Sequence, residues 1–115
     1  MARGDVLTVD LPAPSGAAGH EQVGYRPAIV VQTGLTNANF STTMIVPLTS
    51  NLNALRFPHT IQVDPSPQNG LATPSVLLVF QLRAIDKRRL GKRLGRLEQH
   101  HMQQLEIEIR HLLGL

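Results

Sequence analysis

The spacing of apolar residues along the chain predicts a run of β-strands followed by one helix. Residues 5–11 alternate between apolar and polar positions and stop at Pro12, as expected of a half-buried strand. Residues 26–32 are apolar and rich in β-branched side chains, which predicts a central strand buried on both faces. Because proline cannot donate to a strand ladder, Pro27 is expected at the start of that strand.

Further strands are predicted from the same signals. Residues 42–48 form a third strand that ends in the polar run Thr49-Ser50-Asn51, and residues 59–63 alternate again. The Asp, Pro, Ser, Asn and Gly residues at 64–70 predict a turn. Residues 76–80 predict a buried strand that continues through 81–85, and residues 88–97 add a short strand or a turn.

The C-terminal residues instead have a helical period. Five apolar residues recur at spacings of three and four and form one stripe: Met102, Leu105, Ile109, Leu112 and Leu113. Glu106 and Arg110 are spaced for an ion pair on the other side, and Gly114 is a suitable helix stop. The order of elements predicts a mainly β fold, a small curved antiparallel sheet or barrel with a C-terminal helix packed on it.

The composition is typical of a single domain over residues 1–115. A hydrophobic content of 42% is enough to close one core without a disulfide or a structural metal. The absence of cysteine excludes a disulfide scaffold, a thiolate nucleophile and a Cys-based zinc site, and a cytoplasmic location is expected. The longest apolar stretches are far shorter than the roughly 20 residues of a membrane-spanning helix, so we expect neither an anchor nor a signal peptide.

Positive charge is concentrated in one short segment. The formal net charge is only +3, but seven cations share residues 83–96 with Asp86: Arg83, Lys87, Arg88, Arg89, Lys92, Arg93 and Arg96. The segment indicates a polyanion partner such as nucleic acid, or equally a solvated face that keeps the protein soluble. Few residues are aromatic, so we expect phosphate contacts and loop shape to carry more of any RNA binding than stacked rings.

Local motifs exclude several kinds of chemistry. The chain has no Walker loop, no dinucleotide fingerprint and no Ser nucleophile elbow. His100 and His101 are adjacent and point in different directions on a helix, so no metal or other cofactor is expected. Arg26 opens a buried strand after the long loop at 12–24, and Thr49 ends a neighbouring strand, so both could face one cleft. From position alone, however, strand-start and turn roles explain these two residues without any chemistry.

Several blocks of the sequence resemble, in order, the successive blocks of MazF/PemK-family toxins. They are residues 4–11, 19–31, 46–50, 80–86 and the ending 112–115. The spacing matches over nearly the whole chain, and the Glu-Gln-x-Gly-x-Arg-Pro-Ala block at 21–28 is quite specific. The resemblance implies a small SH3-like barrel of the CcdB/PemK type, a homodimer and an antitoxin peptide as partner. It also implies metal-independent, sequence-selective cleavage of single-stranded RNA that leaves a cyclic phosphate and a free 5′ hydroxyl.

The resemblance gives Arg26 and Thr49 catalytic roles. Arg26 is assigned as the principal phosphate stabiliser with a further part in proton handling, and Thr49 as a hydroxyl donor to the same phosphate. Arginine is a poor general base, so Glu21 and His20 are the candidate proton acceptors, with His59 a weaker one. Each of these three could instead order a loop or lie on the surface. The residues assigned to the RNA groove are Gln22, Tyr25, Ser50, His59, Gln81, Arg83, Arg88 and Arg89.

One departure from the family pattern leaves other functions open. Many members have an acidic residue before Gln-x-Arg, where this chain has Phe80, so no carboxylate mechanism can operate there. We expect the apolar ring in the sheet or under a base. The alternatives are a CcdB-like toxin that binds gyrase without chemistry, against which the Arg26 block argues, and a catalytically silent paralogue that binds RNA or sequesters the antitoxin. The cleavage motif is expected to depend on the loops at 12–24 and 52–58.

Overall fold

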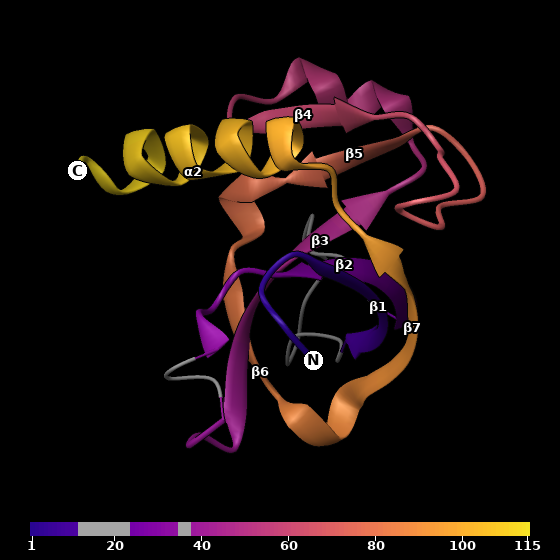
Figure 1. Cartoon of the computed structure of the whole chain (residues 1–115). Coiled ribbons are helices and arrows are strands. Elements are labelled where there is room, and N and C mark those ends of the chain that lie inside the picture. The colour runs from indigo at the N-terminus through magenta and orange to yellow at the C-terminus, as the bar shows by residue number, and fades with distance from the viewer. Residues whose placement is uncertain (12–23, 35–37) are drawn as a thin grey trace.

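The computed structural model describes residues 1–11, 24–34 and 38–115. Within these residues the chain forms seven antiparallel strands and a C-terminal helix (Figure 1). The strands are β1 (Asp5–Leu11), β2 (Gly24–Val30), β3 (Thr42–Thr49), β4 (Thr60–Val63), β5 (Ser75–Leu78), β6 (Arg83–Asp86) and β7 (Leu90–Arg96). Three 3₁₀ helices, η1 (Leu52–Arg56), η2 (Val79–Gln81) and η3 (Lys87–Arg89), connect strands, and α2 (Gln99–Leu113) is the helix. The predicted mainly β fold with a C-terminal helix is confirmed.

The strand order is β4-β5-β3-β2-β1-β7, with β6 paired to β3. Strand β1 has the predicted bounds, whereas β2 begins and ends two residues earlier than predicted. Pro27 was wrongly placed at the strand start, because it is the fourth residue of β2 and lies opposite Thr8 of β1. Strand β3 pairs with β2 from Ala28 onward, so the missing donor of Pro27 falls where β2 runs beyond that pairing. Burial on both faces holds for residues 28–30, while Arg26 is exposed.

The predicted continuous strand at 76–85 is wrong. It divides into β5 and β6, which η2 separates. Both strands pair with the same edge of β3, since Leu77 lies opposite Leu48 and Arg83 lies opposite Ile45. Val79 in the intervening turn is fully buried, so the apolar run looks the same whether it forms a strand or a buried turn. As a result Phe80 lies in a turn and not in the sheet.

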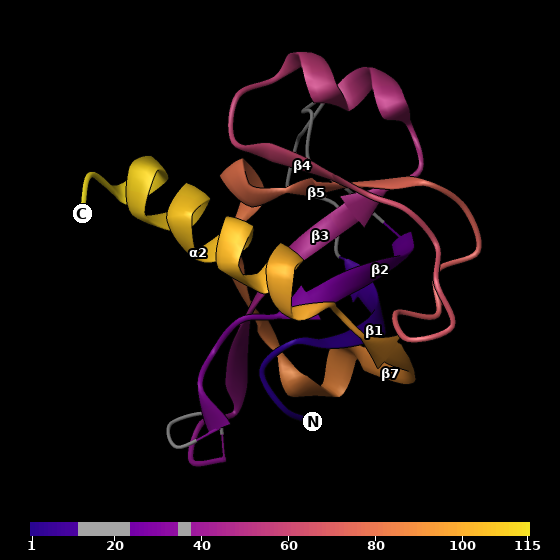
Figure 2. The same ribbon diagram turned by 45° about the horizontal axis from the view of Figure 1, so that its top comes forward.

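Two apolar clusters lie on opposite faces of the sheet. Val6, Ile29 and Val46 belong to the larger cluster, which Met102 and Leu105 of α2 cover. Figure 2 shows α2 lying across this face of the sheet. The smaller cluster lies on the other face and consists of Leu7, Val9, Leu11, Ala28, Val30, Ile45 and Ile85, with Leu90 against it. The candidate site lies at the margin of this second cluster.

The helix follows the predicted stripe in all but its last member. Met102 and Leu105 are buried and Ile109 and Leu112 are partly buried, but Leu113 is 56% exposed. Among the described residues, Glu106 pairs with Arg3 at 2.7 Å and not with Arg110 as predicted. Gly114 has a φ of 72° and ends the helix as expected, since its left-handed conformation is easy for glycine. No helix in the described part of the chain is long and apolar enough to cross a membrane.

The predicted turn at 64–70 is tied to the start of α2 through one fully buried side chain, Asn69. Its Oδ1 accepts from the amides of Ser66 and Leu71, both at 3.0 Å, and its Nδ2 donates to the carboxylate of Glu98 at 3.2 Å. Burial raises the pKa of Glu98, but hydrogen bonds from Ser66, the backbone and Asn69 outweigh it and lower that pKa. The turn also approaches β7, because Arg96 donates its amide to Gln68 at 2.8 Å.

Candidate active site

Arg26 of β2 and Thr49 of β3 both lie just beyond the point where the pairing of these two strands ends. Ala28 of β2 lies opposite Pro47 of β3, and extending this antiparallel register by two residues brings Arg26 level with Thr49. Cross-strand partners share a face, and so do residues two apart along a strand. Arg26 is exposed and Thr49 is 9% exposed. On this continued register, both residues belong to the face of the sheet that carries the smaller cluster.

The sheet opens at this point because β3 changes partner. The pairing of β2 with β3 consists of residues 28–30 with 45–47, whereas Leu48 and Thr49 pair with β5 on the other edge. Arg26 still pairs with Val9 of β1. The Thr49 hydroxyl accepts from the amide of Asn51 at 3.2 Å, which fixes the oxygen and leaves its own proton available to donate.

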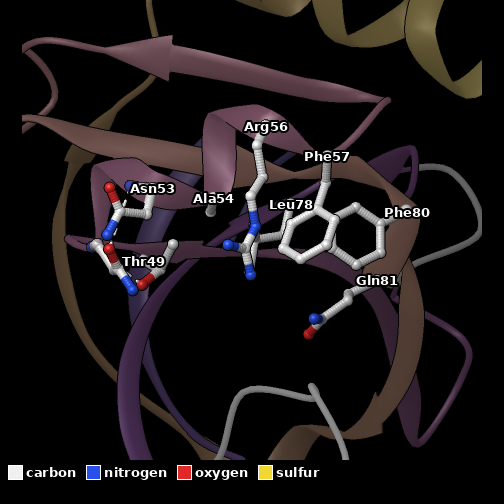
Figure 3. Close-up of a pocket in the computed structure, with 9 residues that line it drawn as sticks. Thr49, Asn53, Ala54, Arg56, Phe57, Leu78, Phe80 and Gln81 are labelled. Carbon is white, nitrogen blue, oxygen red and sulfur yellow. Dashed lines mark hydrogen bonds between the residues drawn. The ribbon is translucent and has the colours of Figure 1, made fainter.

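A small open cleft of about 210 Å³ extends from Thr49 toward η1 and η2. Its lining consists of Thr49, Asn51, Asn53, Ala54, Arg56, Phe57, Leu78, Phe80 and Gln81. The volume is below the roughly 300 Å³ at which pockets begin to enclose a small molecule, so the cleft suits one group of a longer ligand. Figure 3 shows the side chains of Arg56 and Gln81 projecting toward the open space of the cleft.

The turn η1 carries the polar side chains of the cleft. Asn51 caps it by accepting from the amide of Asn53 at 3.1 Å. The last residue of η1 is Arg56, whose guanidinium carbon lies 4.9 Å from the ring centroid of Phe57. No role was predicted for these residues from the sequence, although the cleavage motif was expected to depend on the loop at 52–58. An arginine beside a phenylalanine in that loop was the signal available.

Other predicted site residues are divided between the cleft and its surroundings. Gln81 lines the cleft, and Ser50 lies between two of its lining residues. Arg83 lies opposite Ile45 on the same face as Thr49 but further along β3. Tyr25 is 75% exposed and, as the neighbour of Arg26 in a strand, points to the opposite face. The predictions for His20, Glu21 and Gln22 lie outside the described residues.

His59 is turned toward the helix. Its Nδ1 lies 3.3 Å from Oε2 of Glu108, and its φ of 57° sets the chain direction after η1. His59 is absent from the residues that line the described cleft. Within the described residues, no three His, Cys, Asp or Glu side chains are grouped so that they could hold a metal.

The part of the basic segment around the start of β7 lies at the Arg26 end of the sheet, and several cations of the segment have acidic partners. Val9 of β1 pairs with Arg26 on one side and with Leu90 on the other, which places the start of β7 two strand spacings, about 10 Å, from Arg26. Arg88 pairs with Asp86 at 2.8 Å and Arg89 with Asp10 at 3.8 Å. The hydrogen bonds from Arg88 lower the pKa of Asp86 to about 2.

Arg93 has a structural partner instead. Its Nε lies 3.2 Å from the carboxylate of Asp5, whose side chain is 6% exposed. The same carboxylate also accepts from the amide of Ala2 at 2.7 Å. Arg93 is itself exposed, but removing it would leave the buried Asp5 carboxylate without its cation, a role that no other cation of the segment is shown to have in the described residues.

Comparison with known proteins gives matches over nearly the whole chain. Residues 2–113 match the family model of the PemK-like, MazF-like toxins of type II toxin–antitoxin systems. Endoribonuclease MazF of Staphylococcus saprophyticus is 33% identical over 115 residues, which cover 100% of this chain and 92% of that protein. The crystal structure of MazF from Deinococcus radiodurans is similar with a TM-score of 0.79 at 24% identity, covering 100% of this chain and 97% of that one. An endoribonuclease from a mycobacterial species, solved with its cognate antitoxin, has a TM-score of 0.75 at 23% identity, covering 100% and 96%.

Proposed function

Because the chain belongs to the PemK-like, MazF-like toxins of type II toxin–antitoxin systems, we propose that it is an endoribonuclease that cuts single-stranded RNA without a metal. The observation that supports the proposal is the register of β2 with β3, which ends at Ala28 and Pro47 and, continued by two residues, aligns Arg26 with Thr49 where the sheet opens. A guanidinium and a fixed hydroxyl at an accessible opening can contact one phosphate from two sides. The relative in Staphylococcus saprophyticus is named an endoribonuclease.

The proposed reaction is an in-line displacement at phosphorus. The 2′ oxygen of one nucleotide attacks the adjacent phosphorus, the bond to the 5′ oxygen breaks, and a 2′,3′-cyclic phosphate and a 5′ hydroxyl form. Arg26 stabilises the negative charge that builds on the phosphoryl oxygens, since a guanidinium donates two parallel hydrogen bonds in fixed geometry. The Thr49 hydroxyl donates to the same group. A base removes the 2′ proton and an acid supplies one to the leaving oxygen; His20 and Glu21 remain the candidates by residue type.

The proposed partners are RNA, a second copy of the chain and an antitoxin peptide. A barrel of this size offers little concave surface, so a groove between two copies would give a strand of RNA a longer path. The cations near Leu90 would then contact phosphates at the edge of that groove. The mycobacterial endoribonuclease that was solved with its antitoxin provides the precedent for such a peptide.

The test is RNA cleavage by the purified protein in EDTA. Wild type should cut and should leave cyclic phosphate ends, because no step of the proposed reaction uses a metal. Arg26→Ala should lose cleavage by a factor of at least about 100, as for removal of one preorganised donor to a developing oxyanion, while its unfolding curve stays unchanged. Thr49→Ala should lose less, because a neutral hydrogen bond is weaker than a charge-assisted one.

Arg110→Ala is the matched control, since that exposed arginine lies in the last turn of α2. It should cleave like wild type. Restoration of activity by Mg²⁺ after EDTA has stopped it would refute the metal-free reaction. A folded wild type that cuts no RNA would instead favour a binding toxin of the CcdB type.

A further inference from the structure

An apolar wall and a polar wall face each other across the cleft beside Thr49. Phe57 follows η1 and Phe80 lies in η2, yet their ring centroids are 5.6 Å apart with a tilt of 57° between the planes. Leu78 and Ala54 extend the apolar wall. The chain has only four aromatic residues, which predicted little stacking surface, but the fold brings two of them together at the candidate site (Figure 3).

Arg56 adds a planar cation to this pair of rings. Its guanidinium lies over Phe57, and its side chain is exposed at the mouth of the cleft. A guanidinium held against an aromatic ring is restricted in orientation, and its edge can donate two parallel hydrogen bonds. Asn53 supplies an amide to the same space, with both donor and acceptor atoms.

The shape and chemistry of the cleft match one unpaired nucleobase. A base has a flat apolar face that stacks on aromatic side chains and a polar edge that hydrogen-bonds to side chains. The cleft volume of about 210 Å³ limits it to a single group. Thr49 forms one end of the cleft, so a nucleotide whose phosphate contacts Thr49 has its own or its neighbour's base within reach of Phe80.

We propose that the cleft is a nucleobase subsite in which an unpaired RNA base next to the cut phosphate stacks on Phe57 and Phe80. This inference rests on the proposed endoribonuclease function and makes Arg56 a specificity-determining residue. Stacking on an aromatic ring does not distinguish one base from another, so the choice of base depends on hydrogen bonds to its polar edge. An arginine fork fits the O6 and N7 acceptors of guanine, so the subsite should favour guanine.

The experiment pairs Phe80→Leu with an abasic scan. Leucine keeps an apolar side chain but removes the ring. The activity that this variant loses therefore reports on stacking more than on packing. Wild type and variant are assayed for kcat/KM on RNA oligonucleotides of one cleaved sequence, each with one abasic nucleotide at a different position around the cut. On intact RNA the kcat/KM of the variant should fall about five- to 150-fold, as expected for removal of one base–aromatic stack.

The decisive result is the position at which this loss disappears. With the abasic nucleotide at the subsite, wild type and Phe80→Leu should be equal within about twofold, while every other abasic position should keep the full difference. Phe80→Tyr retains a ring and should behave like wild type. Phe40→Leu is the matched control, because Phe40 is an exposed ring before the opposite end of β3, and it should show no loss.

Arg56→Lys tests selection separately from stacking. It keeps the charge but loses the planar fork, so the preference for guanine should fall at the same single position while other positions stay unchanged. A loss with Phe80→Leu that is equal at all abasic positions, or no loss at all, overturns the subsite while leaving the endoribonuclease intact. A wild type that cuts no RNA overturns both proposals.

Discussion

Replacing Asn69 with alanine should leave two backbone amides of the turn at 64–70 without an acceptor, while Ser66 still donates to Glu98 at 2.7 Å. The side chain is fully buried and its Oδ1 satisfies two backbone amides, those of Ser66 and Leu71. A buried donor left without an acceptor costs about 1–3 kcal/mol. The Leu71 amide is buried and the Ser66 amide is partly buried, so we expect the free energy of unfolding to fall by about 2–4 kcal/mol.

This loss should be measurable without unfolding the protein. A chain of 115 residues has an expected stability of roughly 6–17 kcal/mol at about 0.05–0.15 kcal/mol per residue. Asn69→Ala should therefore remain folded at 25 °C but melt roughly 10–20 °C lower. Urea titration followed by circular dichroism gives the free energy of unfolding directly. A loss below about 1 kcal/mol would mean that water or a shifted backbone satisfies both amides, and the reasoning would be wrong.

Asn69→Asp provides the control for the donor side of the same network. Aspartate keeps an acceptor for the two amides but replaces Nδ2, which donates to the Asp64 carbonyl at 2.9 Å and to Glu98 at 3.2 Å, with a second carboxylate oxygen. The variant should be destabilised at pH 7 by repulsion between the two carboxylates. Adding Glu98→Gln should restore much of the lost stability, whereas the same change in Asn69→Ala should not. If Glu98→Gln changed the stability of Asn69→Asp and of Asn69→Ala by the same amount, a direct contact between residue 69 and Glu98 would be contradicted.

Gly95→Ala should destabilise the fold by about 1–3 kcal/mol in thermal unfolding, because an added Cβ would overlap the Gln68 carbonyl oxygen and lie 2.6 Å from the carbonyl carbon of Asn69. Stability should fall in acid, since the pKa of Glu98 in the folded protein is lowered from its ordinary value of 4.5. The contribution of Glu98 to the free energy of unfolding is complete above that value and is lost as the pH falls through the pKa of the folded protein. In urea titrations at several pH values, the stability of Glu98→Gln should therefore depend less on pH than that of wild type. Neutralising three cations of the basic segment, Arg88, Arg89 and Lys92, should weaken RNA binding for all sequences and flatten its salt dependence without changing the cut site. Arg93→Ala should instead lower stability, since it leaves Asp5 buried without its cation.

The sequence predicted the parts of the fold that depend on local periodicity. Strand β1 and helix α2 follow directly from alternation and from the three-and-four spacing, and Gly114 ends the helix where expected. The break between β5 and β6 was missed because Val79 is as apolar in a buried turn as it would be in a strand. Leu113 was assigned to the buried stripe although the body of the protein does not cover it.

For the candidate site, the sequence alone determined the residue types and the resemblance that singles out Arg26 and Thr49. The register of β2 with β3 ends at Ala28 and Pro47, and only its continuation by two residues aligns Arg26 with Thr49. Only the tertiary structure decided that Phe57 and Phe80 meet, that Arg56 lies over one of these rings, and that Arg93 is tied to a buried carboxylate. The contacts of Phe57 with Phe80 and of Arg93 with Asp5 join positions 23 or more residues apart, so no local pattern in the sequence encodes them. The contact between the two rings depends on β5 following η1 back along β3, and the contact of Arg93 with Asp5 depends on the pairing of β1 with β7; packing of the whole chain makes both choices.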